Sequence, residues 1–171
     1  MQGGKRLSRD EVPFRWLYEW VQALVTVVLC AVVVFAFAAR LVLVSGPSMR
    51  ETLQDQDCLV VLSPLLCGDY EAGDIVIIQR ESFRDGEPIV KRIIATEGQT
   101  VDIDFDAGVV YVDGTALEEP YTREPTWTQE GTEFPLTVPE GCVFVMGDNR
   151  NDSDDSRDSA LGPVDTRCVL R

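Results

Sequence analysis

A serine and a lysine are the residues of this sequence whose types and positions could support covalent chemistry. The stretch "VLVSGPSMRETL", residues 42–53, places Ser48 just after a long apolar run. The chain contains no histidine, so a serine nucleophile would need another base. A lysine can serve when its amine is uncharged near the working pH, and Lys91 is the only lysine beyond residue 5. Ser48 and Lys91 are therefore the candidate nucleophile and base.

The predicted surroundings of Lys91 favour an uncharged amine. In "EPIVKRIIATEG", residues 87–98, strand alternation places Ile89, Lys91 and Ile93 on one face. Burial between two branched aliphatic side chains disfavours the ammonium and lowers the pKa of a lysine. A change from about 10.4 to about 8 needs roughly 3 kcal/mol of desolvation, which burial can supply. The alternative is a lysine that extends from the margin of a sheet into water and stays charged.

A dense run of Asp, Asn and Ser follows an apolar stretch late in the chain: "MGDNRNDSDDSR", residues 146–157. Calcium binding is a weak alternative here, because Arg157 stands where an EF-hand loop needs glycine and Pro163 where it needs a bidentate glutamate. The composition favours a turn with Asp155 and Arg157 paired internally. Ser153, in the same turn, is a candidate hydrogen-bond partner for a neutral lysine.

The apolar run before Ser48 predicts one membrane-spanning helix over residues 20–44. Residues 21–39 contain no charged side chain, and nineteen helical residues extend about 28 Å, close to the ~30 Å hydrocarbon core of a bilayer. Basic residues before the run predict a cytoplasmic segment, residues 1–19, and an extracytoplasmic domain, residues 45–171. A cleavable signal peptide is the alternative, since "AFA" at 36–38 resembles a processing site, but the run is longer than a usual h-region.

Charge and cysteine content exclude some classes of function. The chain has 15 Lys and Arg against 29 Asp and Glu, a net charge of −14, and the acidic excess lies after residue 44. Such a surface repels nucleic acid, so no nucleic-acid partner is expected. No CxxC motif or Cys/His spacing suggests zinc. Four cysteines follow the predicted span and allow three disulfide pairings, all left open: Cys58, Cys67, Cys142 and Cys168.

Short β-branched runs separated by turn residues predict an all-β domain after the span. The expected strands lie at residues 58–65, 73–80, 88–98, 100–105, 109–114, 134–141 and 142–149. Residues 118–132 are polar and rich in turn formers, which predicts a loop or a loose hairpin. We expect the strands to form a rolled or partly open barrel.

The order of these motifs resembles bacterial signal peptidase I. Ser48 and Met49 follow a membrane span, "GDIV" follows at 73–76, "KR" at 91–92 and "GDNRNDSDDSR" at 147–157. Order and approximate spacing agree with that family from about residue 40 to residue 165. The last motif is highly specific, whereas "GDIV" alone is weak.

The resemblance implies a serine endopeptidase with a Ser-Lys dyad on the mostly β fold of that family. Ser48 matches the nucleophile and Lys91 the general base. The other matches support the site: Ser153 orients the lysine, Asp155 and Arg157 form a buried ion pair, and Met49 lies near the substrate-binding surface. The implied substrates are exported preproteins with small residues before the cut. The resemblance also implies that the enzyme contacts the lipid of the cell membrane. It implies no metal or organic cofactor.

Two positions depart from the pattern of that family. Glu51 stands where many relatives have proline, and we expect it to change the rigidity of the turn rather than the chemistry. Gly46 stands where some relatives have a serine whose hydroxyl assists the oxyanion. We therefore expect an oxyanion hole of backbone N–H groups, including that of Ser48.

Two other functions remain as alternatives. One is a membrane-tethered β-domain that binds an envelope partner without catalysis. The other is a related Ser-Lys peptidase with a different duty, such as a specialised processor of a narrow set of clients. A self-cleaving repressor is disfavoured, because the chain has neither the room nor the charge for a DNA-binding module.

Overall fold

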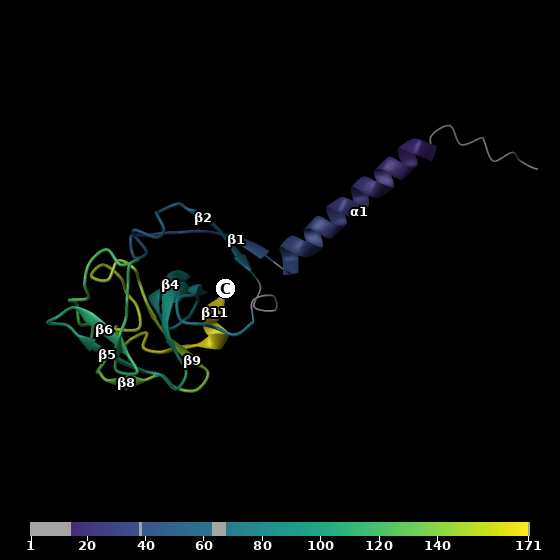
Figure 1. Cartoon of the computed structure of the whole chain (residues 1–171). Helices are drawn as coiled ribbons and strands as arrows, with labels where there is room; N and C mark the ends of the chain where they lie inside the picture. The colour runs from purple at the N-terminus through teal and green to yellow at the C-terminus, as the bar shows by residue number, and fades with distance from the viewer. Residues whose placement is uncertain (1–14, 38, 63–67, 171) are drawn as a thin grey trace, which may run out of the picture. The chain divides into compact units, whose positions relative to one another are not determined.

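The computed structural model describes residues 15–37, 39–62 and 68–170. One N-terminal helix is followed by short strands, and the chain divides into two units between Ala39 and Arg40 (Figure 1). The mostly β fold with one N-terminal apolar helix is thereby confirmed, and the rolled or barrel form stays a prediction. Cys67 and most of the predicted cytoplasmic segment lie outside the described residues.

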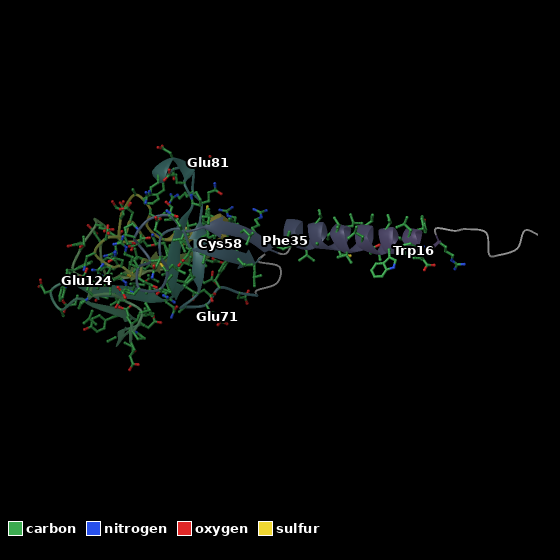
Figure 2. The ribbon with its side chains drawn as sticks, turned by 90° about the horizontal axis from the view of Figure 1, so that it is seen from above. Trp16, Phe35, Cys58, Glu71, Glu81 and Glu124 are labelled. Atoms are coloured by element: carbon green, nitrogen blue, oxygen red, sulfur yellow. The ribbon has the colours of Figure 1, made fainter. Side chains whose placement is uncertain are left out.

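Helix α1 spans Arg15–Phe37, and its side chains are mostly apolar. The polar ones, Arg15, Glu19, Gln22 and Thr26, lie in its first half. Side chains from Trp16 to Phe35 are exposed, and Figure 2 shows them projecting from both visible edges of the helix. By length and composition alone the helix can cross a membrane, although a signal segment near an N-terminus has the same features. A membrane anchor therefore stays a prediction.

The end of this helix differs from the prediction. The sequence predicts a span that reaches residue 44, whereas α1 ends at Phe37 and Ala39–Leu43 forms strand β1. Strand β1 pairs with β2, Cys58–Leu62, in a two-stranded sheet. Arg40 interrupts the apolar run, and pairing with β2 gives the backbone of this segment hydrogen-bond partners outside a helix.

The other described strands form two antiparallel sheets. A five-stranded sheet has the order β10-β9-β4-β3-β11, and a four-stranded sheet the order β7-β6-β5-β8. The strands of the larger sheet are β3 (Ile75–Ile78), β4 (Ile89–Thr96), β9 (Cys142–Met146), β10 (Val164–Asp165) and β11 (Val169–Leu170). Those of the smaller sheet are β5 (Thr100–Asp104), β6 (Val109–Val112), β7 (Thr115–Ala116) and β8 (Leu136–Thr137). Two 3₁₀ turns complete the described elements: η1 (Arg84–Gly86) and η2 (Thr166–Cys168).

Each strand predicted from the sequence has a counterpart, usually over a shorter range. The additional strands β7, β10 and β11 have two residues each, which is too short for an alternating pattern to reveal them. Of the cysteines beyond β1, Cys58, Cys142 and Cys168 carry free thiols in the described part of the chain.

Strand β4 is largely buried and carries the predicted base. Lys91 pairs with Val76 of β3, and Arg92 pairs with Met146 of β9. Side chains of β4 enter three separate apolar clusters: Ile89 and Ile93 the first, Ile94 and Ala95 the second, Val90 the third. Both faces of β4 are therefore covered, and its side chains have little access to water.

The segment at residues 118–132 contains no helix or strand, and Gly131 makes an isolated β-bridge with Asp158. The segment is nevertheless held in place. Its Glu119 pairs with Arg150, and the Asn151 side-chain oxygen accepts two backbone N–H groups of the segment. A loop is thus correct as a prediction of local structure, but the loop is fixed by polar contacts with residues 147–157.

Candidate active site

Ser48 lies between β1 and β2 in a tight turn, residues 46–53, which we call the Ser48 turn. It begins at Gly46, whose φ of +96° favours glycine. Backbone hydrogen bonds close the turn, among them the Leu53 N–H donating to the Met49 carbonyl at 2.8 Å. The Ser48 residue is partly exposed, which leaves its hydroxyl within reach of a substrate.

The Lys91 side chain reaches Ser48 from the middle of β4. Its Nζ donates a hydrogen bond to the Ser48 Oγ at 2.8 Å, and the residue is only 2% exposed. The alternative of a lysine extending into water is therefore wrong. Burial lowers the pKa of Lys91 to about 8, although the carboxylates of Asp155 and Asp154 act in the opposite direction.

This geometry permits a proton transfer that needs no histidine. At 2.8 Å an uncharged Lys91 amine is within range to take the proton of the Ser48 hydroxyl. With a pKa of about 8, a substantial fraction of the amine is neutral at mildly alkaline pH. The arrangement can thus produce a nucleophilic oxygen on Ser48 from the chain's own residues.

Asp155 and Arg157 form an ion pair in which both side chains are fully buried. The guanidinium donates to both carboxylate oxygens at 2.9 Å, the bidentate geometry that gives strong pairs. The Ser153 hydroxyl donates to the same carboxylate at 2.9 Å. The structure thus brings these three residues together. A direct contact of Ser153 with the Lys91 amine stays a prediction.

Met49 is 1% exposed and packs in the third apolar cluster, with Val61, Ile77 and Val90. Because it adjoins Ser48 in sequence, its burial fixes the Ser48 turn to the larger sheet. Contact between Met49 and a substrate stays a prediction.

Comparison with known proteins assigns the family. A sequence model of the family described as "Signal peptidase, peptidase S26" matches residues 17–170. The chain belongs to this family. It is 38% identical over 161 residues to signal peptidase I of Bacillus licheniformis, covering 90% of this chain and 84% of the relative. The resemblance found in the sequence is confirmed, and the chain is an enzyme of the serine peptidase class.

Other relatives show a similar degree of likeness to this peptidase. Signal peptidase I T of Bacillus subtilis (strain 168) is 38% identical over 154 residues, covering 85% of this chain and 77% of the relative. The probable signal peptidase I-1 of Synechocystis is 34% identical over 151 residues, covering 84% and 74%. A solved signal peptidase I from Enterococcus faecalis V583 is 36% identical, with a TM-score of 0.47 over 60% of this chain and 94% of that chain.

Gly147 allows the segment after β9 to approach Ser48 closely. A Cβ atom at this position would lie 2.5 Å from the Ser48 carbonyl oxygen and 2.2 Å from the Ser153 Oγ. The Gly147 N–H also donates to Asp155 at 2.9 Å. Only glycine therefore fits without displacing its neighbours. Gly147 belongs to the 147–157 motif, but the sequence does not reveal this steric reason.

Asn149 was not singled out from the sequence, yet it contacts the Ser48 turn twice. Its backbone N–H donates to the Ser48 carbonyl at 2.9 Å, and its side-chain Nδ2 donates to the Pro47 carbonyl at 3.1 Å. Its place inside the 147–157 motif is the one signal that could have drawn attention to it.

Arg92 and Asp148 form a second ion pair that holds the far end of the same turn. The guanidinium donates to both oxygens of the fully buried Asp148 carboxylate, at 2.8 and 2.7 Å. The Thr52 hydroxyl donates to that carboxylate as well. The Arg92 Cζ lies 4.1 Å from the centre of the Tyr121 ring, a cation–π contact with the 118–132 segment. Strand β4 thus presents Lys91 to Ser48 and Arg92 to Thr52 through Asp148.

Glu51 adopts a backbone conformation that proline cannot reach. Its φ is +84°, whereas the proline ring fixes φ near −65°. The turn of this peptidase therefore differs at residue 51 from a turn that carries proline there. Glu51 in place of proline therefore goes with a different backbone conformation, and not only with a different rigidity of the turn.

Proposed function

We propose that this peptidase is a membrane-anchored serine endopeptidase that removes N-terminal signal peptides from exported preproteins with a Ser48–Lys91 dyad. The observation that carries the proposal is the 2.8 Å separation between the Lys91 Nζ and the Ser48 Oγ, with the lysine buried. The relatives named above are signal peptidases, which supports the class of substrate.

In the first half of the reaction, the neutral Lys91 amine takes the proton of the Ser48 hydroxyl as the Oγ attacks the scissile carbonyl carbon. The carbonyl oxygen becomes an oxyanion, for which backbone N–H groups including that of Ser48 are the proposed donors. When the C–N bond breaks, the Lys91 ammonium gives its proton to the leaving amine. The products are the released mature protein and an ester of Ser48.

In the second half, the neutral Lys91 amine takes a proton from a water molecule that attacks the ester carbon. The bond between that carbon and the Ser48 Oγ then breaks, and the Ser48 oxygen recovers its proton from Lys91. The signal peptide leaves with a free carboxylate. The ion pair of Asp155 and Arg157 supports the site and takes no proton in either half.

The proposed substrate sites accept small side chains, typically Ala, before the cut, because larger ones would overfill shallow apolar pockets. Helix α1 is the proposed anchor, with a cytoplasmic N-terminus and the β-domain that begins at β1 outside the membrane. Ser48 follows α1 closely in the sequence. A membrane-held signal peptide would therefore meet its nucleophile near the lipid surface.

The test is cleavage of a preprotein by the purified full chain in detergent. Ser48→Ala and Lys91→Met are each expected to lower the rate by at least about 10³-fold. Ser82→Ala, at an exposed serine far along the chain, is the matched control and is expected to cleave at the normal rate. Circular dichroism and thermal melting verify that each variant keeps its fold.

The outcomes separate the proposal from its alternatives. Near-normal turnover by Lys91→Met contradicts the dyad. A folded wild-type chain that cleaves no preprotein of a broad panel points to a tethered domain that binds an envelope partner. Cleavage of one or two members of the panel points to a specialised processing peptidase with a narrow client set.

A further inference from the structure

Asn149 holds the two peptide groups on either side of the Ser48 Cα. Its backbone N–H donates to the Ser48 carbonyl at 2.9 Å, and its Nδ2 donates to the Pro47 carbonyl at 3.1 Å. The residue is 3% exposed, so both bonds are shielded from competing water. The Pro47 carbonyl also accepts the Arg50 N–H at 3.0 Å, within the turn, so both of its lone pairs are used.

The direction of the Pro47 carbonyl determines the direction of the Ser48 N–H. The two groups belong to one planar trans peptide, in which C=O and N–H point to opposite sides. A carbonyl held toward Asn149 therefore turns the Ser48 N–H away from the 147–157 segment. Among the residues that the structure describes, no acceptor takes this N–H. A free backbone donor beside a nucleophile is what an oxyanion requires.

The two residues before Ser48 contribute little to holding this peptide in place. Gly46 brings no side chain and has a permissive backbone, and Pro47 has no N–H to donate. The torsions on each side of the Pro47–Ser48 peptide, ψ of Pro47 and φ of Ser48, are single-bond torsions that no ring or double bond fixes. The local Arg50 bond restrains one lone pair of the carbonyl, and the Asn149 amide restrains the other from outside the turn.

The same pair of strands positions the base and this amide. Strand β4 carries Lys91, and β9 pairs with β4 through Arg92 and Met146. Asn149 follows the end of β9 by three residues. A shift of the Ser48 turn relative to β4 would thus disturb its bonds to Lys91 and to Asn149 together.

We propose that the Asn149 side chain is a positioning residue, which keeps the Ser48 N–H directed at the oxyanion of the substrate carbonyl. The inference rests on the proposed role of Ser48 as nucleophile. It assigns to Asn149 a function in the transition state rather than in proton transfer, because the amide touches the backbone of the turn and not the Lys91 amine.

The test compares Asn149→Ala with wild type in the full chain, with a cleavable peptide and two inhibitors. One inhibitor is a peptide boronic acid, whose tetrahedral adduct on Ser48 places an oxygen at the oxyanion position. The other is the product peptide with a free carboxylate, which forms no such adduct. We expect kcat to fall about 10- to 100-fold with KM unchanged, since one misdirected donor affects the transition state most. The boronic acid is expected to lose affinity by the same factor, and the product peptide to keep its affinity.

The pH dependence of kcat/KM distinguishes this role from a general loss of structure, which would also disturb the titration of Lys91. Because the Lys91 amine is untouched, kcat/KM of Asn149→Ala should keep the midpoint of the wild-type pH profile. Asn149→Asp retains the side-chain volume but replaces the donor with an acceptor. It is the second variant, and it is expected to lose activity at least as strongly.

Asn151→Ala is the matched control, because the Asn151 Nδ2 also donates to a proline carbonyl, that of Pro125, at 3.0 Å. It is expected to keep the wild-type ratio of boronic acid to product-peptide affinity. Equal losses for both inhibitors in Asn149→Ala, or a wild-type kcat, would overturn the role of Asn149. Full cleavage by Ser48→Ala would instead overturn the proposed function, so the two failures are distinguishable.

Discussion

Lys91 places its Nζ 2.8 Å from the Ser48 Oγ, although 43 positions of sequence separate the two residues. The approach depends on a lysine buried in a strand whose two faces are covered, and on a turn fixed to the sheet by Met49. The same burial that prepares the amine to accept a proton also disfavours its charged form. Activity and stability should therefore respond to pH through one group.

The rate of cleavage should rise with pH as Lys91 loses its proton. With the pKa of Lys91 lowered to about 8 by burial, kcat/KM should increase through a midpoint near that pH and then level off. Asp154 raises this pKa and Arg84 lowers it. Asp154→Asn should therefore shift the midpoint to lower pH and Arg84→Gln to higher pH. Shifts of equal sign in both variants would contradict Lys91 as the titrating group.

Lys91 should make the folded state more stable as the solution becomes alkaline. Its pKa is about 8 in the fold, against 10.5 for an unperturbed lysine, so between these values the unfolded chain binds more protons and the free energy of unfolding rises with pH. Below pH 8 the buried ammonium costs roughly 3 kcal/mol. The difference in urea stability between wild type and Lys91→Met, measured from pH 7 to 11, should narrow across that window. A constant difference would show that the lysine is not buried.

Arg150 should contribute strongly to stability through the 118–132 segment. Its side chain is 1% exposed and pairs with both oxygens of Glu119, so its removal leaves a carboxylate without a charged partner in a largely buried place. Arg150→Met should lower the free energy of unfolding by about 3–5 kcal/mol and speed amide hydrogen exchange in the segment. The exposed pair of Arg167 and Asp165 is the comparison, and Arg167→Met should change stability little.

Glu51 should tolerate glycine and reject proline. Its φ of +84° is unfavourable for a residue with a side chain, so Glu51→Gly should raise the free energy of unfolding by about 1 kcal/mol and retain cleavage. Glu51→Pro cannot adopt this φ and should lower both stability and kcat/KM, because the Ser48 turn must rearrange. Thermal melts and cleavage rates of the two variants check the prediction. An active, stable proline variant would show that the turn accepts a second conformation.

Much of the fold could be predicted from the sequence because its signals are local. Seven strands followed from short β-branched runs between turn residues, and α1 followed from an uninterrupted apolar stretch. The end of that helix was missed, since residues 39–43 are equally apolar whether they continue a helix or pair with β2. Strand pairing is a contact between distant segments, and the hydrophobicity of one segment does not show whether it pairs with another.

For the candidate site, too, local features could be predicted from the sequence and contacts between distant segments could not. The absence of histidine and the position of a single lysine in a branched aliphatic strand made Ser48 and Lys91 candidates, and the resemblance to signal peptidase I gave them their roles. The contacts of Asn149 with Pro47 and of Asp148 with Arg92 and Thr52 came only from the tertiary structure. The Asn149 contact with Pro47 spans 102 positions and depends on the pairing of β4 with β9. Residue types determine what chemistry is available, whereas hydrogen-bond directions exist only after the sheet has brought the segments together.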